Sequence, residues 1–253
     1  MGLFGKLKPP VTQADKEWLE EAFLWIEKEF GAEFLKTVEI ITPTPRYFPG
    51  EYQGREEDGE FYFQKVCEYM KVPLMRVSFG YYSEQRQEFQ PGQFTSLSPG
   101  LTDQFQGSAG LYMKRGNARQ RIEVEIGELK DPEGLISTIA HELAHVKLLG
   151  EERIHENDEP LTDLVAVAFG FGIFMGNSVF HFSQWQTGEY QGWETRRKGY
   201  LPEQMIAYSL ALMVNYQGKE TVDWEKFLNK SMRQYFRKSL KYIRKYPEEV
   251  GFK

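Results

Sequence analysis

The stretch that decides the fold of this chain covers residues 131–145 and reads DPEGLISTIAHELAH. It begins with Asp131 and Pro132, an N-cap residue followed by proline at the first helical position, which predicts the start of a helix. Its last five letters, HELAH, place His141 and His145 four residues apart. Side chains at this spacing lie on one face of a helix, so both imidazoles can point at one metal ion.

Glu142 directly follows the first of these histidines, close enough to reach a water molecule on such an ion. Metal-bound water ionises near neutral pH, and a neighbouring carboxylate can accept its proton as the water attacks a carbonyl carbon. The chain has four histidines, and two of them fall in this motif. The alternative is a helix whose two histidines are hydrogen-bonded in the core. We predict a site for one zinc ion, with His141 and His145 as ligands and Glu142 as the general base.

A catalytic zinc ion usually has three protein ligands and one open position, so a third ligand is needed. A third histidine six residues after the motif is excluded, because Glu151 stands there. Glu159, at the start of the next helix, is the preferred candidate, and Asp163 lies on the same face of that helix. The helix dipole alone could also explain carboxylates at this position. The other acids that could serve as the third ligand are Glu151, Glu152, Glu156 and Asp158.

The HExxH motif followed by Glu159-x-x-x-Asp163 resembles the gluzincin type of zinc metallopeptidase. The short spacing is similar to that of the compact members called minigluzincins, and the resemblance covers about residues 110–178. It implies that Glu159 is the third zinc ligand and that Asp163 hydrogen-bonds the first histidine. A ligand imidazole needs such a partner on its other nitrogen to hold its tautomer.

The pattern of elements predicts one α+β domain of zincin type over residues 1–253, with a metallopeptidase core at about 110–178 and a mostly helical part at 179–253. Hydrophobic periodicity distinguishes the helices from the strands. A polar connection is predicted at 50–60 and a long loop at 84–108. The predicted helices are 13–30, 61–70, 132–145, 160–175, 202–216 and 222–246, and the predicted strands are 38–42, 74–82, 110–114 and 121–127.

The predicted strand at 121–127 alternates, with aliphatic residues at 122, 124 and 126 and charged residues between them, which indicates one buried face. The resemblance implies that this strand is the antiparallel edge of a small twisted sheet, where an extended peptide could pair with it. An ordinary edge strand, protected by its charged side chains, is the alternative. Farther along the chain, Gly170 and Gly172 are expected to let another backbone approach closely.

Peptide hydrolysis also requires a hydrogen-bond donor for the oxyanion. Four side chains beyond the ligand helix could serve, although each alone is better explained as a packing or surface residue. Tyr200 and His181 are the preferred candidates. The other two are Tyr190 and Tyr208.

The composition favours a cytoplasmic protein. The only cysteine is Cys67, so an internal disulfide is excluded. The first residues lack the apolar segment of a secretory signal, and the longest apolar run, 164–176, is too short to span a bilayer. The net charge of −6 gives no reason to expect a nucleic-acid partner.

The last predicted helix is strongly basic, with eight Lys or Arg and no acid between Lys226 and Lys245. Such a helix can bind an anionic membrane, a nucleic acid or an acidic partner. Its apolar stripe favours the alternative, a helix packed on the core with its charged face in solvent.

Together these features predict a cytoplasmic zinc-dependent metallopeptidase that acts on a peptide or protein substrate. The first alternative is a regulatory or partner-binding protein that keeps the zincin fold with little or no peptidase activity. The second is a hydrolase acting on a non-peptide amide.

Overall fold

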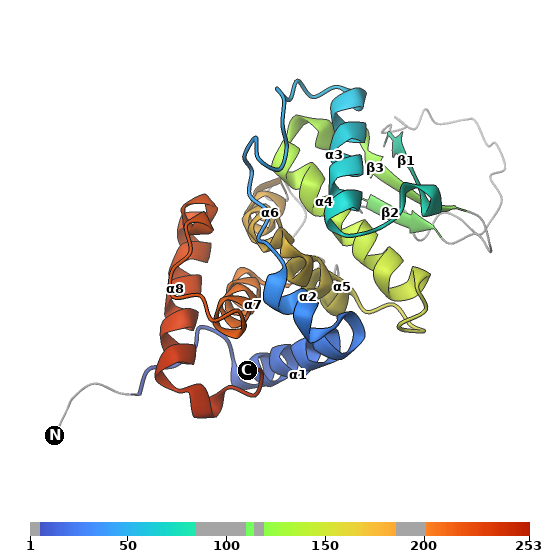
Figure 1. The fold of residues 1–253 in the computed structure, drawn as a ribbon. Coiled ribbons are helices and arrows are strands. Elements are labelled where there is room, and N and C mark those ends of the chain that lie inside the picture. The colour runs from blue at the N-terminus through green and yellow to red at the C-terminus, as the bar shows by residue number, and fades with distance from the viewer. Residues whose placement is uncertain (1–5, 84–109, 114–118, 186–200) are drawn as a thin grey trace, which may run out of the picture.

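The computed structural model describes residues 6–83, 110–113, 119–185 and 201–253. Most of this part of the chain is helical, and one small sheet accompanies the helices, so the α+β class is confirmed. Figure 1 shows the sheet at one side of the molecule and the last helix at the other. The helices and strands are α1 (Gln13–Phe30), α2 (Ala32–Thr37), α3 (Glu56–Tyr69), β1 (Val77–Tyr82), β2 (Gly110–Met113), β3 (Gln120–Glu125), α4 (Pro132–His145), α5 (Glu159–Ala166), α6 (Gly172–Trp185), α7 (Glu203–Tyr216) and α8 (Lys230–Lys245).

The sheet has the strand order β1-β3-β2. Strand β3 pairs in parallel with β1, where Val77 lies opposite Gln120, and antiparallel with β2, where Gly110 lies opposite Val124. The prediction that the strand at 121–127 forms the edge of the sheet is therefore wrong, because β3 is central and has a neighbour on each side. Alternation correctly predicted that Ile122 and Val124 are buried, but it was wrong at Ile126, which lies after the end of β3 and is 39% exposed. It indicates which face of a strand is buried, but not which strands lie beside it.

Helix α4 packs against the sheet on one side and against α5 and α6 on the other (Figure 1). It begins as predicted, with Pro132 in its first turn and the Asp131 carboxylate accepting a hydrogen bond from the Gly134 amide at 3.1 Å. The helix is buried on most of its surface because layers cover both sides. A π-helical turn, Val146–Gly150, follows His145 directly. Such turns are frequent at functional sites.

Several predicted boundaries were wrong. Residues 38–42 form no strand, and instead the Ile41 amide donates to the carbonyl of Gly170 at 2.9 Å. Helix α3 begins at Glu56, so the polar connection before it is shorter than predicted. The last helix begins only at Lys230, after a separate 3₁₀ turn at Trp224–Phe227. The predicted loop at 84–108 lies outside the described residues.

Gly170 lies at a kink between α5 and α6, within the π-helical turn Val167–Phe171. Its φ of 98° is a conformation that favours glycine. A Cβ atom there would collide with the carbonyl oxygen of Glu39. The predicted close approach of another backbone is confirmed at this glycine. At Gly172 the nearest neighbour is the side chain of Leu210.

We expect Gly170→Ala to lower the free energy of unfolding by about 2–4 kcal/mol, because it adds backbone strain and displaces the segment at Glu39. Gly31→Ala is the matched control, since Gly31 has a φ of 97° and a Cβ there would meet nothing within 4 Å. It should cost only the strain, about 1 kcal/mol. Urea denaturation of both variants measures the difference, and equal losses would contradict the role of the Glu39 contact.

One continuous helical run, Glu159–Ser178, is long and apolar enough to cross a membrane by length and composition. However, 89% of its most apolar window is buried inside the protein. The run contains α5, the π-helical turn and the first part of α6. Burial of this extent is typical of a core helix, and it places Glu159 at the exposed end of that helix.

Candidate metal centre

The last turn of α4 and the first turn of α5 bring three side chains together. The Oε2 atom of Glu159 lies 3.1 Å from Nε2 of His141 and 3.5 Å from Nε2 of His145. The three ligand atoms lie within 4.8 Å of one another. Among the residues that the structure describes, these three side chains form the one group of His, Cys or acidic residues that could hold a metal ion.

The two distances from Glu159 to the histidine nitrogens suit a tetrahedral ion. Two donors bound to zinc at about 2.0–2.1 Å lie about 3.3 Å apart at the tetrahedral angle, and the two distances from Glu159 bracket this value. Burial by itself would lower the pKa of His141, but its hydrogen bonds to Asp163 and Glu159 raise it well above its ordinary value. Burial by itself would raise the pKa of Glu159, but its hydrogen bonds to His141 and His145 hold that pKa below its ordinary value. A carboxylate that attracts two imidazoles in this way also suits a divalent cation.

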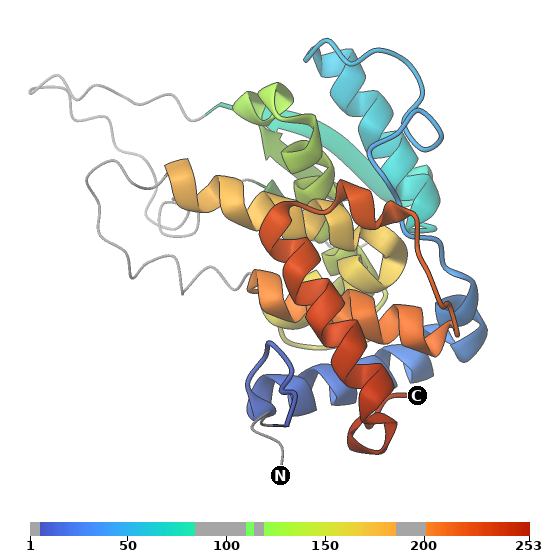
Figure 2. The ribbon, with the colours of Figure 1, turned by 90° about the vertical axis from the view of Figure 1, so that its left-hand side faces the viewer.

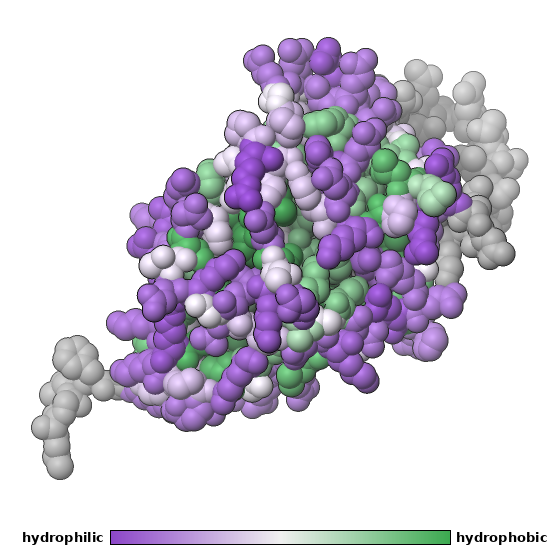
Figure 3. Space-filling model, in the orientation of Figure 1, coloured by the Kyte–Doolittle hydropathy of each residue, from purple (hydrophilic) through white to green (hydrophobic). Residues whose placement is uncertain are grey.

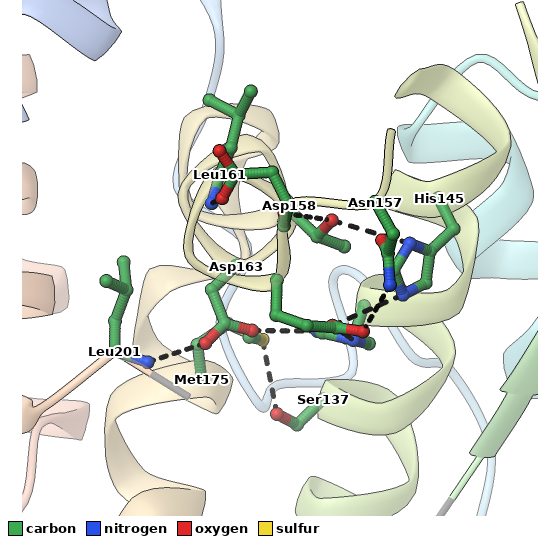
Figure 4. Close-up of polar contacts among 11 residues, drawn as sticks. Ser137, His145, Asn157, Asp158, Leu161, Asp163, Met175 and Leu201 are labelled. Carbon is green, nitrogen blue, oxygen red and sulfur yellow. Dashed lines mark hydrogen bonds and ion pairs between the residues drawn. The ribbon is translucent and has the colours of Figure 1, made fainter. Parts of the chain in front are cut away.

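Asp163 holds the first imidazole from behind. Its Oδ1 lies 2.7 Å from Nδ1 of His141, and its Oδ2 accepts a hydrogen bond of 2.7 Å from the Leu201 amide (Figure 4). The carboxylate is 1% exposed. When the imidazole is neutral, this contact keeps the proton on Nδ1 and leaves the lone pair of Nε2 directed at Glu159.

The second imidazole and the third ligand also have partners. Thr162 Oγ1 donates to the carbonyl of Asp158 at 2.8 Å, so its lone pairs remain available to Nδ1 of His145 at 3.4 Å. The amide of Asn157 donates to Oε1 of Glu159 at 2.7 Å. This bond uses Oε1, while Oε2, the other oxygen of Glu159, is the atom that lies close to Nε2 of both histidines.

Glu142 lies between the two histidines in the chain and is buried, with 5% of its surface exposed. Its Oε2 atom is inaccessible and has no hydrogen-bond partner in the structure. Burial raises the pKa of this carboxyl, although the neighbouring histidines act in the opposite direction. A buried carboxylate oxygen without a partner is costly. A water molecule placed between Glu142 and an ion would provide the missing hydrogen bond.

The other acids considered as third ligands are placed elsewhere. Glu151 pairs with Lys147 at 2.9 Å and with Arg153 at 3.1 Å. Asp158 is the N-cap of α5 and accepts from the Leu161 amide at 3.0 Å. Glu152 and Glu156 are exposed. Of the five acids, Glu159 alone belongs to the group of possible ligands.

Among the residues whose side chains the structure describes, we identify no donor for the oxyanion. The hydroxyl of Tyr208 is buried and donates to Glu20 at 2.7 Å. His181 belongs to α6, but its side chain is not described. Tyr190 and Tyr200 lie outside the described residues.

Sequence reasoning missed three partners in this centre, namely Asn157, Thr162 and the backbone amide of Leu201. Asn157 and Thr162 flank Glu159 in the sequence, so their proximity was a usable signal. The Leu201 amide carries no such signal, because every residue except proline has an amide.

A pocket of about 650 Å³ lies away from these residues. Its lining comes from the N-terminal ends of α4 and α8 and from Asn177 and Ser178. The pocket residue Asp131 precedes α4 and His145 ends it, so about 20 Å of helix separates them. This pocket is not part of the candidate metal centre.

Comparison of the chain with protein-family models, with curated proteins and with solved structures finds no match. The function of the protein must therefore be inferred from the chemistry of the centre itself.

Proposed function

We propose that this protein is a zinc-dependent metallopeptidase of the gluzincin type, with His141, His145 and Glu159 as the zinc ligands. Two imidazoles and one carboxylate are a ligand set that catalytic zinc sites use. Support comes from the spacing of the three ligand atoms and from the partners that orient each of them. Glu159 keeps 37% of its side chain exposed, so the centre is accessible from one side.

The observation that carries the proposal is the unpartnered Oε2 of Glu142. A protein that used these histidines only for packing would gain nothing from a buried carboxylate without a hydrogen bond. A general base, in contrast, needs an oxygen that is free to accept a proton.

In the proposed reaction, Glu142 accepts a proton from the attacking water and passes it to the amine that leaves. A bound zinc ion supplies Lewis acidity, which polarises the scissile carbonyl and makes the water more acidic. Asp163 and Thr162 hold the two imidazoles with their Nε2 atoms directed at the centre. Asn157 holds Glu159 so that one of its oxygens faces the same point.

Metal analysis together with peptide cleavage tests the proposal. We expect the purified protein to contain one zinc ion per chain and to cleave unstructured peptides. A chelator should abolish cleavage, and zinc should restore it. His145→Ala should lose both metal and cleavage. His155→Ala is the matched control, because His155 is exposed and outside the group, and it should keep both.

Retention of zinc by His145→Ala would contradict the ligand assignment. Protein that holds zinc but cleaves no peptide would instead favour a regulatory or partner-binding role. If the protein cleaves other amides but no peptides, the result would favour a hydrolase that acts on a non-peptide amide.

A further inference from the structure

Helix α8 lies at the side of the molecule opposite the sheet (Figure 1) and crosses in front of α7 in Figure 2. Its apolar side is buried, through Met232, Phe236 and Ile243. The opposite side is exposed and carries only basic and neutral polar side chains. This side of the molecule is predominantly hydrophilic in Figure 3. We call the five exposed cations there the basic face; they are Lys230, Arg237, Lys238, Lys241 and Lys245.

At 100° per residue, these five side chains fall within about 100° of the helix circumference. They extend along about 22 Å of helix. Lys230, Lys238 and Lys241 form no ion pair with any described residue, whereas Arg237 pairs with Glu225. This concentration of positive charge is unexpected in a chain whose net charge is −6.

The other two arginines of α8 have a structural explanation. Arg233 donates to the carbonyls of Lys226 and Leu228 at 2.8 and 2.9 Å. Arg244 donates to the carbonyls of Lys219 and Glu220, both at 2.8 Å. Hydrogen bonds to backbone carbonyls thus explain Arg233 and Arg244, but they do not explain Lys230, Lys238 and Lys241.

The start of the described chain reaches the C-terminal end of the same helix. Lys6 pairs with Glu249, and its ammonium group lies 5.2 Å from the centre of the Tyr246 ring. Lys6 therefore brings a further basic side chain, from the opposite end of the chain, to the C-terminal end of α8.

We propose that the basic face binds the surface of an anionic lipid bilayer. A bilayer surface requires only positive charges that reach one plane, and each lysine near it strengthens binding about fivefold. A nucleic acid fits less well. Arginine is preferred for contacts with phosphates and bases, and the arginines of α8 are engaged with carbonyls or with Glu225. The described part of this face also has no fully exposed aromatic ring on which bases could stack.

Vesicle flotation tests the proposal, with phosphatidylcholine vesicles that contain or lack phosphatidylserine. We expect the wild-type protein to bind only the anionic vesicles, and to be released by high salt. Lys238→Glu/Lys241→Glu should weaken binding at least about thirtyfold, since two attractive charges are lost and two repulsive ones are added. The matched control is Lys36→Glu/Lys130→Glu, which makes the same charge change at two exposed lysines outside α8 and should leave binding unchanged.

Binding to neutral vesicles as strong as to anionic ones, or an equal loss in the α8 pair and its control, would overturn the proposal. Tighter binding of duplex DNA than of anionic vesicles would also overturn it, in favour of a nucleic-acid partner. The proposal is independent of the metal centre, because no residue of the basic face belongs to that centre. Protein without zinc should therefore bind vesicles as the intact protein does.

Discussion

Glu142→Gln should lower the rate of peptide cleavage by about 10²–10⁴-fold, the usual contribution of a general base. Glutamine has nearly the same shape but cannot accept the proton of the attacking water. Zinc content should be unchanged, because the three ligands remain. Steady-state kinetics and metal analysis of the same preparation measure both quantities.

The stability of Glu142→Gln is a second readout. Burial raises the pKa of Glu142 in the folded protein, so the charged carboxylate destabilises the fold at any pH above the pKa of the unfolded chain. Neutral glutamine removes this cost, and we expect the zinc-free variant to unfold at a higher urea concentration than the zinc-free wild type at pH 7. A variant that is more stable and inactive would indicate that the carboxylate is kept for chemistry. Unchanged cleavage would reject the proposed role of Glu142.

Glu20→Ala should lower the free energy of unfolding by about 3–5 kcal/mol, because it leaves the buried ammonium group of Lys16 without a counter-charge. Glu20 lies 2.9 Å from the Nζ of Lys16, and their side chains are 7% and 4% exposed. The same carboxylate accepts hydrogen bonds from the hydroxyl of Tyr208 at 2.7 Å and the amide of Gly251 at 2.8 Å. It thus connects α1, α7 and the C-terminal segment.

An ion pair of the same length provides the control for Glu20→Ala. Lys65 and Glu68 are also 2.9 Å apart, but their side chains are 27% and 63% exposed. Glu68→Ala should therefore change the free energy of unfolding by no more than about 1 kcal/mol. Denaturation curves of the two variants measure the contrast. A loss at Glu20 as small as that at Glu68 would show that burial of the first pair has little effect.

Features that depend on neighbours in the sequence were predictable. The start of α4 at Asp131 and Pro132 is confirmed because N-capping involves only the first turn of a helix. Likewise, the cap of α1 involves only its first turn, where the Thr12 side chain accepts a hydrogen bond from the Asp15 amide. The spacing of His141 and His145 was sufficient to place both imidazoles on one side of α4.

Features that depend on distant segments were predicted less well. Five acidic residues remained candidates for the third metal ligand, because the sequence does not show how the chain returns from α4 to α5. The position of β3 in the centre of the sheet depends on β1, which lies more than forty residues away in the register Val77 to Gln120. The segment at 38–42 has the composition of a strand, yet its Ile41 amide bonds to a kinked helix.

The sequence by itself determined the two histidines, the adjacent glutamate and the helix that carries them, since helical spacing alone brings those groups together. Only the tertiary structure decided that Glu159 reaches both imidazoles, that the amide of Leu201 holds Asp163, and that Glu142 is buried without a partner. Each of these depends on how α5 packs against α4 or on how the segment before α7 meets α5. The physical reason is that local patterns specify helices and strands, whereas contacts between distant segments depend on how the whole core packs.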